Sequence, residues 1–423
     1  MRGAGDELCS ECFKITLLPA GGTDTLPMKH VLSLSTLYPN PVNPRFGTFV
    51  ARSLEALAKR GEVHGDWQVS VVNPIGIPPV AMGRYRALSR MPESAEEHGI
   101  TVHRPQFTLI PKIGANRNTT AIAKAALPVV ERIHAAHPID LIDAQFFFPD
   151  GPAAARIAEA IGVPLSIKAR GSDITYWGEQ AGALKQMRRA ANAASGLLAV
   201  SRSLADQMAV LGMPADKIRI HYTGLDRNRF RPLEHTQLRA QLTRELGFDL
   251  PDTVPVLACV GALIERKGQD IAIASLPQID GARLILVGKG EDEAHLKNLA
   301  GDLGLSDRVL FAGSVDHDVL PLILSASDVM VLPTANEGLA NAWVEALACG
   351  TPVVTCNVGG AGELIARPAA GRLVRRDPDS VAAGVNDVLN NPPARDTVAQ
   401  LAQRFSWDTN AAELAAHYNA IIR

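Results

Sequence analysis

Short apolar runs alternate with stretches of helical periodicity along most of the chain. In the first half, runs typical of buried strands occupy residues 30–36, 68–74, 141–145, 164–169 and 196–201, and the segments 48–60 and 153–161 have the pattern of helices. In the second half, similar runs occupy residues 256–263, 283–290, 309–315, 329–334 and 352–357. This alternation predicts an α/β chain whose parallel strands are joined by crossover helices.

The segment 218–234 contains Gly224 and Pro232 and is expected to join two halves of about 200 residues each, a normal size for one doubly wound domain. We therefore expect a first domain over residues 28–222 and a second over 223–404. Residues 1–27 differ in character from the rest and are interpreted as a loosely ordered extension, with Met28 as the start of translation. Open parallel sheets bind ligands at the carboxyl ends of their strands, so two such domains would face each other across a binding cleft.

Composition supports two buried cores, because 47% of the 423 residues are hydrophobic and 20% are charged. Nowhere does the sequence contain about 18 uninterrupted apolar residues, so we expect a soluble protein without a membrane span. Five cysteines, an odd number, favour free thiols in a cytoplasmic setting. Cys9 and Cys12 form a C-x-x-C pair, but a zinc site needs a second pair of ligands nearby.

Charge is distributed unevenly although the formal net charge is only −2. Residues 28–226 hold 22 Lys and Arg against 16 Asp and Glu, whereas residues 227–423 hold 18 against 24. A basic first half favours an anionic acceptor or a peripheral contact with a membrane surface. Solvated surface arginines are an equally good interpretation.

The segment 334–365 carries the most informative pattern. Glu337 precedes a predicted helix whose first turn is Gly338, Leu339, Ala340 and Asn341, and Glu345 follows two turns into that helix. The start of a helix offers unpaired N–H groups and a positive dipole end, so a diphosphate bound there needs no metal. Carboxylates on either side could accept hydrogen bonds from sugar and ribose hydroxyls.

This E-x7-E pattern, in the frame EGLANAWVEALACGTPVV and followed by Gly359 and Gly360, resembles the hallmark of family-4 glycosyltransferases. The resemblance covers residues 30–422 and is densest in the second half. It implies a GT-B fold of two Rossmann-like domains, with an acceptor-binding first domain and a second domain that binds a nucleotide sugar. It also implies that the terminal helix, residues 405–423, packs back on the first domain, with Trp407 as an anchor.

Three further segments of the second half resemble donor-binding parts of the family. Arg266 and Lys267 follow Gly261 and resemble the basic pair that holds the diphosphate. The family usually has an arginine directly after this glycine, where this chain has Ala262. The remaining expected donor contacts are Gly288 in a glycine turn, and Gly313 and Val315 near the nucleobase.

The first half carries further expected site residues: Gly47 binds the donor, Arg170 is catalytic together with Arg266, Lys267 and Glu337, and the acceptor side holds Thr48, Asp150, Ser172 and Asp173. Gly47 and Thr48 resemble a loop near the phosphates and the acceptor, or form an ordinary turn that opens a helix. Arg170 stands where many relatives have a histidine; it can bind or stabilise charge but cannot act as a base. Helix capping explains Ser172 and Asp173 equally well and explains Asp150 better.

No metal or other cofactor is expected. Asp316 and Asp318 have the D-x-D spacing of a metal site, but their position before an apolar run is better explained by helix capping. Ser201 resembles a serine beside the donor phosphates, and capping explains it almost as well.

The resemblance implies a metal-independent, retaining transfer of a sugar from a nucleotide diphosphate to a glycan or lipid-linked acceptor in cell-surface polysaccharide biosynthesis. Retention in this family is attributed to front-face attack assisted by the departing phosphate. The alternatives are a non-catalytic scaffold that binds a sugar nucleotide, a phosphorylase, or a nucleotide-sugar epimerase. A dinucleotide oxidoreductase is disfavoured because G-x-G-x-x-G follows none of the predicted strands. No nucleic-acid partner is expected.

Overall fold

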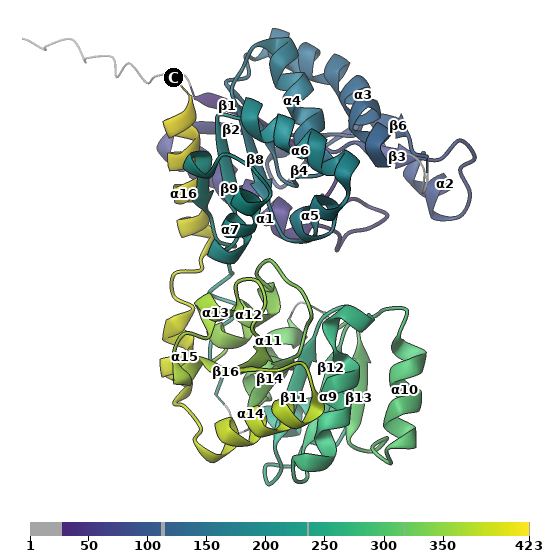
Figure 1. Ribbon diagram of the computed structural model, residues 1–423, viewed down its shortest axis with the longest axis vertical. Helices are drawn as coiled ribbons and strands as arrows, with labels where there is room; N and C mark the ends of the chain where they lie inside the picture. Colours follow the sequence, from purple (N-terminus) through teal and green to yellow (C-terminus); the bar gives the residue numbers. More distant parts are fainter. Residues whose placement is uncertain (1–27, 111–114, 235–236, 317, 423) are drawn as a thin grey trace, which may run out of the picture.

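The first half of the chain folds around one large sheet with helices on both faces (Figure 1). The computed structural model describes residues 28–110, 115–234, 237–316 and 318–422. The strand order is β10-β9-β8-β7-β1-β2-β5-β4, and β4 alone in this order is antiparallel to its neighbour. The strands are β1 (Lys29–Leu34), β2 (Trp67–Val72), β4 (Ser94–Glu97), β5 (Ile100–His103), β7 (Leu141–Ala144), β8 (Leu165–Ala169), β9 (Gly196–Ala199) and β10 (Ile218–Ile220).

Crossover helices connect these strands, and a separate two-stranded ribbon interrupts the pattern. The ribbon consists of β3 (Ile75–Ile77) and β6 (Gln106–Thr108), which pair in parallel. The helices of this half are α1 (Thr48–His64), α2 (Arg84–Leu88), α3 (Ala115–Ala136), α4 (Asp150–Ile161), α5 (Ser172–Thr175), η1 (Trp177–Glu179), α6 (Ala181–Ala193), α7 (Arg202–Val210) and η2 (Ala215–Lys217).

The second half forms a six-stranded, all-parallel sheet in the order β13-β12-β11-β14-β15-β16. Its strands are β11 (Val256–Val260), β12 (Arg283–Val287), β13 (Val309–Gly313), β14 (Val329–Leu332), β15 (Val353–Cys356) and β16 (Gly371–Val374). Most are almost wholly buried, which explains why they are continuous apolar runs and not alternating ones. The helices are α8 (Leu238–Leu246), η4 (Glu265–Lys267), α9 (Gln269–Ser275), η5 (Leu276–Gln278), α10 (Glu293–Asp302), α11 (Val319–Ala326), α12 (Asn341–Ala348), α13 (Ala361–Leu364), η6 (Pro368–Ala370), α14 (Pro378–Asn390) and α15 (Arg395–Leu401).

The last helix, α16 (Trp407–Ile421), leaves the second domain and packs along α1 of the first (Figure 1). Tyr418 is fully buried there and meets Trp67 edge to face, with ring centroids 5.4 Å apart. Trp407, at the start of α16, lies against Gly224, where a Cβ would overlap its indole ring. The chain therefore crosses between the domains twice.

The doubly wound architecture predicted from the sequence is confirmed, and every predicted strand is present. The two predicted helices are also present but longer, since they run to His64 and from Asp150. The expected connector at 218–234 is shorter than predicted, because its first three residues form the edge strand β10. The periodicity analysis did not identify β3, β4, β5, β6 or β16. The predicted extension, with Cys9 and Cys12, lies outside the described residues.

Across the described ranges, no helix is both long enough and apolar enough to cross a bilayer.

Candidate functional site between the two domains

Three glycines end adjacent strands at the carboxyl edge of the second sheet. Gly261 and Gly288 directly follow β11 and β12, and Gly313 ends β13. The Gly261 N–H donates to the carbonyl of Val287 at 2.9 Å, and the Gly288 N–H donates to that of Gly313 at 2.8 Å. Gly288 has a φ of 146°, and a Cβ there would overlap the Gly261 carbonyl oxygen. These residues therefore leave bare backbone at the edge where such sheets bind ligands.

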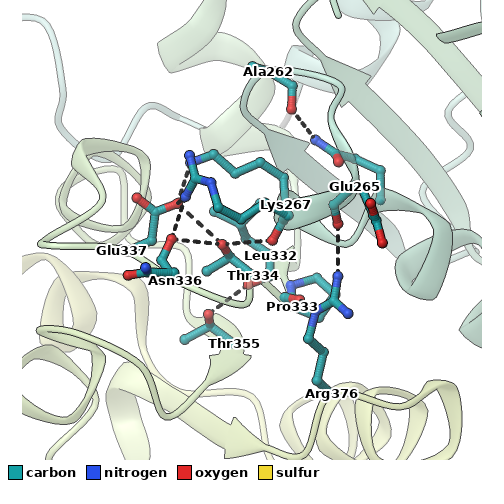
Figure 2. A network of polar contacts seen from close by, with 12 residues as sticks. Ala262, Glu265, Lys267, Leu332, Pro333, Thr334, Asn336, Glu337, Thr355 and Arg376 are labelled. Atoms are coloured by element: carbon teal, nitrogen blue, oxygen red, sulfur yellow. Dashed lines mark hydrogen bonds and ion pairs between the residues drawn. The ribbon is translucent and has the colours of Figure 1, made fainter. Parts of the chain in front are cut away.

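Arg266 and Lys267 extend from η4 to Glu337, and Figure 2 shows Lys267 and Glu337 side by side. Lys267 Nζ forms an ion pair with Glu337 Oε1, and Arg266 Nη1 lies 3.4 Å from the same oxygen. The Thr334 hydroxyl donates to that oxygen at 3.3 Å. The Lys267 and Glu337 side chains are 14% and 12% exposed, so both are held in place yet remain accessible. The cations and the carboxylate expected to bind a donor thus neutralise one another here.

The helix after Glu337 begins later than the sequence suggested. Gly338, Leu339 and Ala340 precede α12, whose first residue is Asn341, so Glu345 lies about one turn into the helix and not two. The cause is the loop at Gly360, whose N–H donates to the Gly338 carbonyl at 2.8 Å. Leu339 packs against the same glycine. These contacts hold residues 338–340 in a non-helical conformation.

Gly338 is also the place where the two domains meet. A Cβ at Gly338 would overlap the Arg170 carbonyl oxygen, and one at Gly171 would lie 3.0 Å from the Gly338 nitrogen. Only glycine allows so close an approach of two backbones. The expected donor and acceptor segments are therefore in direct contact.

Glu345 faces a cavity between the domains. The cavity is lined by Glu345 and Asn341 of α12, Thr48 and Phe49 of α1, and Trp407 of α16, among others. Burial raises the pKa of Glu345 to about 7. Within the described ranges no side chain is recorded in a hydrogen bond or ion pair with this carboxylate, so it is a free acceptor beside a cavity.

Arg170 is held by a buried network that sequence reasoning missed. Its Nε donates to the Gln145 carbonyl at 2.7 Å, and Nη2 donates to the Gln145 side-chain oxygen. Gln145 Nε2 in turn donates to Asp143 at 2.5 Å. Tyr418 of α16 lies near the same carboxylate; burial, and after it the charge of Asp143, raise the pKa of Tyr418 well above its usual value. The Arg170 guanidinium also lies over the Phe49 ring, with its Cζ atom 4.9 Å from the ring centroid.

Burial lowers the pKa of Arg170 to about 10, so the guanidinium remains charged at neutral pH. Asp143 has no local sequence signal of this role, since it lies inside a strand and its partner Tyr418 is 275 positions away. Only the packing of α16 on the first domain brings them together.

Asp150 and Asp173 do not cap helices as expected. The Asp150 carboxylate accepts hydrogen bonds from the Thr36 N–H at 2.9 Å and from its hydroxyl at 2.7 Å, which ties α4 to the loop after β1. Burial raises the pKa of Asp150 to about 7. Asp173 accepts from the N–H groups of Phe147 and Gly171 at 2.8 and 2.7 Å. Both carboxylates fix loops around the site and lie wholly inside the protein.

The remaining predicted residues of this half lie apart: Thr48 lines the cavity of Glu345, Ser172 lines a second hollow, and Gly47 precedes α1. Gly47 opens α1 with a φ of 70°, and a Cβ there would collide with the backbone of Leu37. Ser172 lies in a hollow with Arg170 and three phenylalanines, Phe46, Phe49 and Phe146. Phe49 lines both this hollow and the cavity of Glu345.

The capping role predicted for Asp316 and Asp318 is wrong. Asp318 precedes α11 but makes no side-chain capping bond. Each aspartate instead pairs with an arginine, Asp318 with Arg229 at 2.9 Å and Asp316 with Arg45 at 3.4 Å. Val315, one residue earlier, is partly buried against the core. In the described part of the chain, no group of three or more His, Cys, Asp or Glu residues is arranged to hold a metal ion.

Ser201 caps α7, accepting from the Leu204 N–H at 3.2 Å, and it lies beside Gly360. Next to it, Glu363 of the second domain accepts from the Arg202 N–H at 2.6 Å and from the Tyr222 hydroxyl at 2.7 Å. Sequence reasoning did not identify this link, which binds the two domains beside the site.

Two family profiles match, one on each half. Glycosyltransferase Family 4 matches residues 46–229, and Glycosyl transferases group 1 matches residues 247–405. The putative teichuronic acid biosynthesis glycosyltransferase TuaC of Bacillus subtilis is 28% identical over 93% of this chain and 99% of its own length. An uncharacterized glycosyltransferase of Methanocaldococcus jannaschii is 31% identical over 52% of this chain, and the alignment spans only 59% of that relative.

Among solved structures, Anabaena HepE in complex with UDP has a TM-score of 0.70 at 24% identity, covering 93% of this chain and 100% of that one. This likeness extends over both domains and establishes the GT-B fold. The two profiles, one on each half, and the relatives support a glycosyltransferase of family 4 with this fold.

Proposed function

We propose that this protein transfers a sugar from a nucleotide diphosphate sugar to a glycan or lipid-linked acceptor, with retention of the anomeric configuration and without a metal ion. The observation that carries the proposal is the cluster of Arg266, Lys267 and Glu337 beside the Gly338–Arg170 contact. It combines two cations for a diphosphate with a carboxylate for a sugar, at the point where donor and acceptor segments meet.

Donor binding would proceed by exchange of partners. Lys267 and Arg266 bind the diphosphate in place of Glu337, and charge-assisted hydrogen bonds to phosphate replace the internal ion pair. The freed Glu337 carboxylate accepts hydrogen bonds from sugar hydroxyls. Glu345, a free acceptor beside its cavity, takes the ribose hydroxyls. The bare backbone at Gly261, Gly288 and Gly313 lets the nucleotide lie close to the strand ends.

Chemistry would take place between Glu337 and Arg170. Negative charge builds on the leaving diphosphate as the bond to the sugar breaks, and Lys267 and Arg266 stabilise it there. The acceptor enters from the hollow of Phe46, Phe49 and Phe146, where Arg170 supplies a fixed positive charge. The acceptor hydroxyl attacks from the face the diphosphate leaves, and its proton passes to a departing phosphate oxygen. This course requires neither a protein nucleophile nor a metal.

The kind of acceptor is proposed from one relative and from the charge of the first half. The curated relative TuaC is described as a teichuronic acid enzyme. A role in cell-surface polysaccharide biosynthesis is consistent with that relative and with the basic first half of the chain.

A screen of nucleotide sugars tests the proposal. A ligand that binds only the folded state raises the midpoint of thermal unfolding. We expect one of UDP-, GDP- or ADP-sugars to do so without added metal and with EDTA present, and the same compound to be consumed by the enzyme. The proposal fails if none of them stabilises the protein, or if the bound compound is neither transferred nor hydrolysed.

A further inference from the structure

A basic and apolar projection extends from the first domain between β3 and β4. Residues 78–92, here named the finger, include α2 and connect the two-stranded ribbon to the main sheet. Figure 1 shows α2 and the ribbon at the end of the first domain remote from α16. Nothing in the proposed donor or acceptor site uses this segment.

Apolar side chains are unusually exposed on the finger. Val80 and Met82 are 69% and 70% exposed. Ile110, which follows β6, is 42% exposed. The ribbon is parallel with Ile77 opposite Thr108, so Val80 and Ile110 leave it from the same end. Single exposed apolar residues are ordinary, but three at one end of a projection mark an interaction surface.

The finger also carries positive charge and contains no carboxylate, although Glu93 follows it directly. From Trp67 to Pro92 the chain contains no aspartate or glutamate, and its charged residues there are Arg84, Arg86 and Arg90. All three are exposed. Among the described residues none of these arginines forms an ion pair with a carboxylate; Arg84 instead stacks on Tyr85, 5.1 Å from its ring centroid.

We infer that the finger binds an anionic lipid surface, with Val80 and Met82 at the boundary of the acyl region and the arginines among the headgroup phosphates. Interfacial protein segments combine apolar and basic side chains in this way, and each basic residue near an anionic bilayer strengthens binding about fivefold. A soluble polyanion would not account for the exposed Val80 and Met82. A second copy docked through the same surface would bring like charges together. The value of this contact to the enzyme rests on the proposed function, since a lipid-linked acceptor is found at such a surface.

The test is flotation of the full chain with vesicles of phosphatidylglycerol and phosphatidylcholine, compared with vesicles of phosphatidylcholine alone. We expect binding to the anionic vesicles at low salt and its loss at high salt. The triple variant Arg84→Glu, Arg86→Glu, Arg90→Glu should bind at least a hundredfold less. The double variant Val80→Ser, Met82→Ser should bind about tenfold less.

Matched controls lie elsewhere on the surface. Val210 is 85% exposed, as is the side chain of Arg375, so Val210→Ser and Arg375→Glu each make one change of the same kind outside the finger and should bind as the wild type does. The inference is overturned if the wild type does not bind anionic vesicles, or if the finger variants bind no less than the controls. It is also overturned if the serine variant binds fully and heparin competes, which would indicate a polyanion site, or if the finger variants abolish a dimer.

Nucleotide-sugar stabilisation of the same variants separates this inference from the proposed function. The finger variants should keep the full thermal shift with the donor, because the finger contributes nothing to the donor site. A wild type that floats but binds no nucleotide sugar would contradict the proposed function alone.

Discussion

The proposed donor side and the proposed acceptor side of the site are built in opposite ways. On the donor side, Lys267 and Glu337 are partly accessible and partnered mainly with each other. On the acceptor side, Arg170 is bound to Gln145, which is bound to Asp143, and both are fully buried. Two accessible side chains that pair with each other can give up that contact and bind a ligand instead. A buried hydrogen-bond network, by contrast, holds a side chain in one orientation before any ligand binds. The difference suggests that the donor rearranges its side of the site, whereas the acceptor meets a preformed one.

Removing the exchangeable charges should have the largest effect. Lys267→Ala and Glu337→Ala should each lower kcat by about 10²–10³-fold, because each removes a group that stabilises charge or position in the transition state. The measurement is steady-state transfer with the donor identified by thermal shift.

The matched control for this prediction is the surface pair on α10. Lys297 and Glu293 form an ion pair of 2.7 Å and are 54% and 35% exposed, so their alanine variants make the same chemical change in solvent. They should retain wild-type turnover. Equal losses in both pairs would mean that the donor-side assignment is wrong.

Separating the donor and acceptor segments should have the second-largest effect on turnover. Gly338→Ala introduces a Cβ against the Arg170 carbonyl, so the contact between donor and acceptor segments must open. Displacement of reacting groups by about 1 Å can cost about 10²-fold in rate, and a loss of that order in kcat is expected. A Cβ added at Gly301 of α10 would lie 3.8 Å from the Ser306 hydroxyl, an ordinary van der Waals contact, so Gly301→Ala should leave turnover unchanged. A fully active Gly338→Ala enzyme would show that the contact is not needed.

Loosening the acceptor-side network should have a smaller effect. Gln145→Ala removes the side-chain hydrogen bond to Arg170, worth about 1.5–3 kcal/mol, but keeps the bond from Arg170 Nε to the backbone carbonyl and the Phe49 contact. We expect kcat to fall about tenfold. The double variant with Arg170→Ala should be no slower than Arg170→Ala alone, since Gln145 acts through that arginine. Additive losses would assign Gln145 a separate role.

The smallest effect is expected for replacement of Glu345, which should change the pH dependence of stability and of donor affinity. Its pKa is raised from 4.5 to about 7, so folding favours the protonated acid. The stability that it contributes is present below about pH 4.5 and is lost as the pH rises through about 7. The unfolding temperature should therefore fall less between pH 5 and 8 in Glu345→Gln than in the wild type.

Donor affinity should rise over the same range in the wild type alone, because the ionised carboxylate is the better acceptor for ribose hydroxyls. The cavity also holds Arg52, Asp226 and Arg229. Parallel pH profiles in the two proteins would exclude Glu345 as their cause.

Much of the fold could be predicted from the sequence because parallel strands buried on both faces are continuous apolar runs. The cluster of Arg266, Lys267 and Glu337 could be predicted because each residue stands next to a recognisable strand end or helix. The expectations that the structure overturned depend on contacts between residues far apart in the sequence. Asn341 opens α12 because Gly360 holds the preceding residues. Asp318 pairs with Arg229, 89 positions away, in preference to the helix that follows it. Likewise, no local pattern could have linked Asp143 to Tyr418.

The central claim is that Lys267 and Arg266 release Glu337 to bind a donor diphosphate between the domains. Its most direct test is calorimetric titration of the stabilising nucleotide sugar, and of its nucleoside monophosphate, into the wild type and the Lys267→Ala and Lys297→Ala variants. The account predicts that Lys267→Ala weakens binding of the diphosphate sugar at least tenfold but leaves that of the monophosphate nearly unchanged, while Lys297→Ala alters neither. Equal affinity of all three proteins for the nucleotide sugar would contradict it.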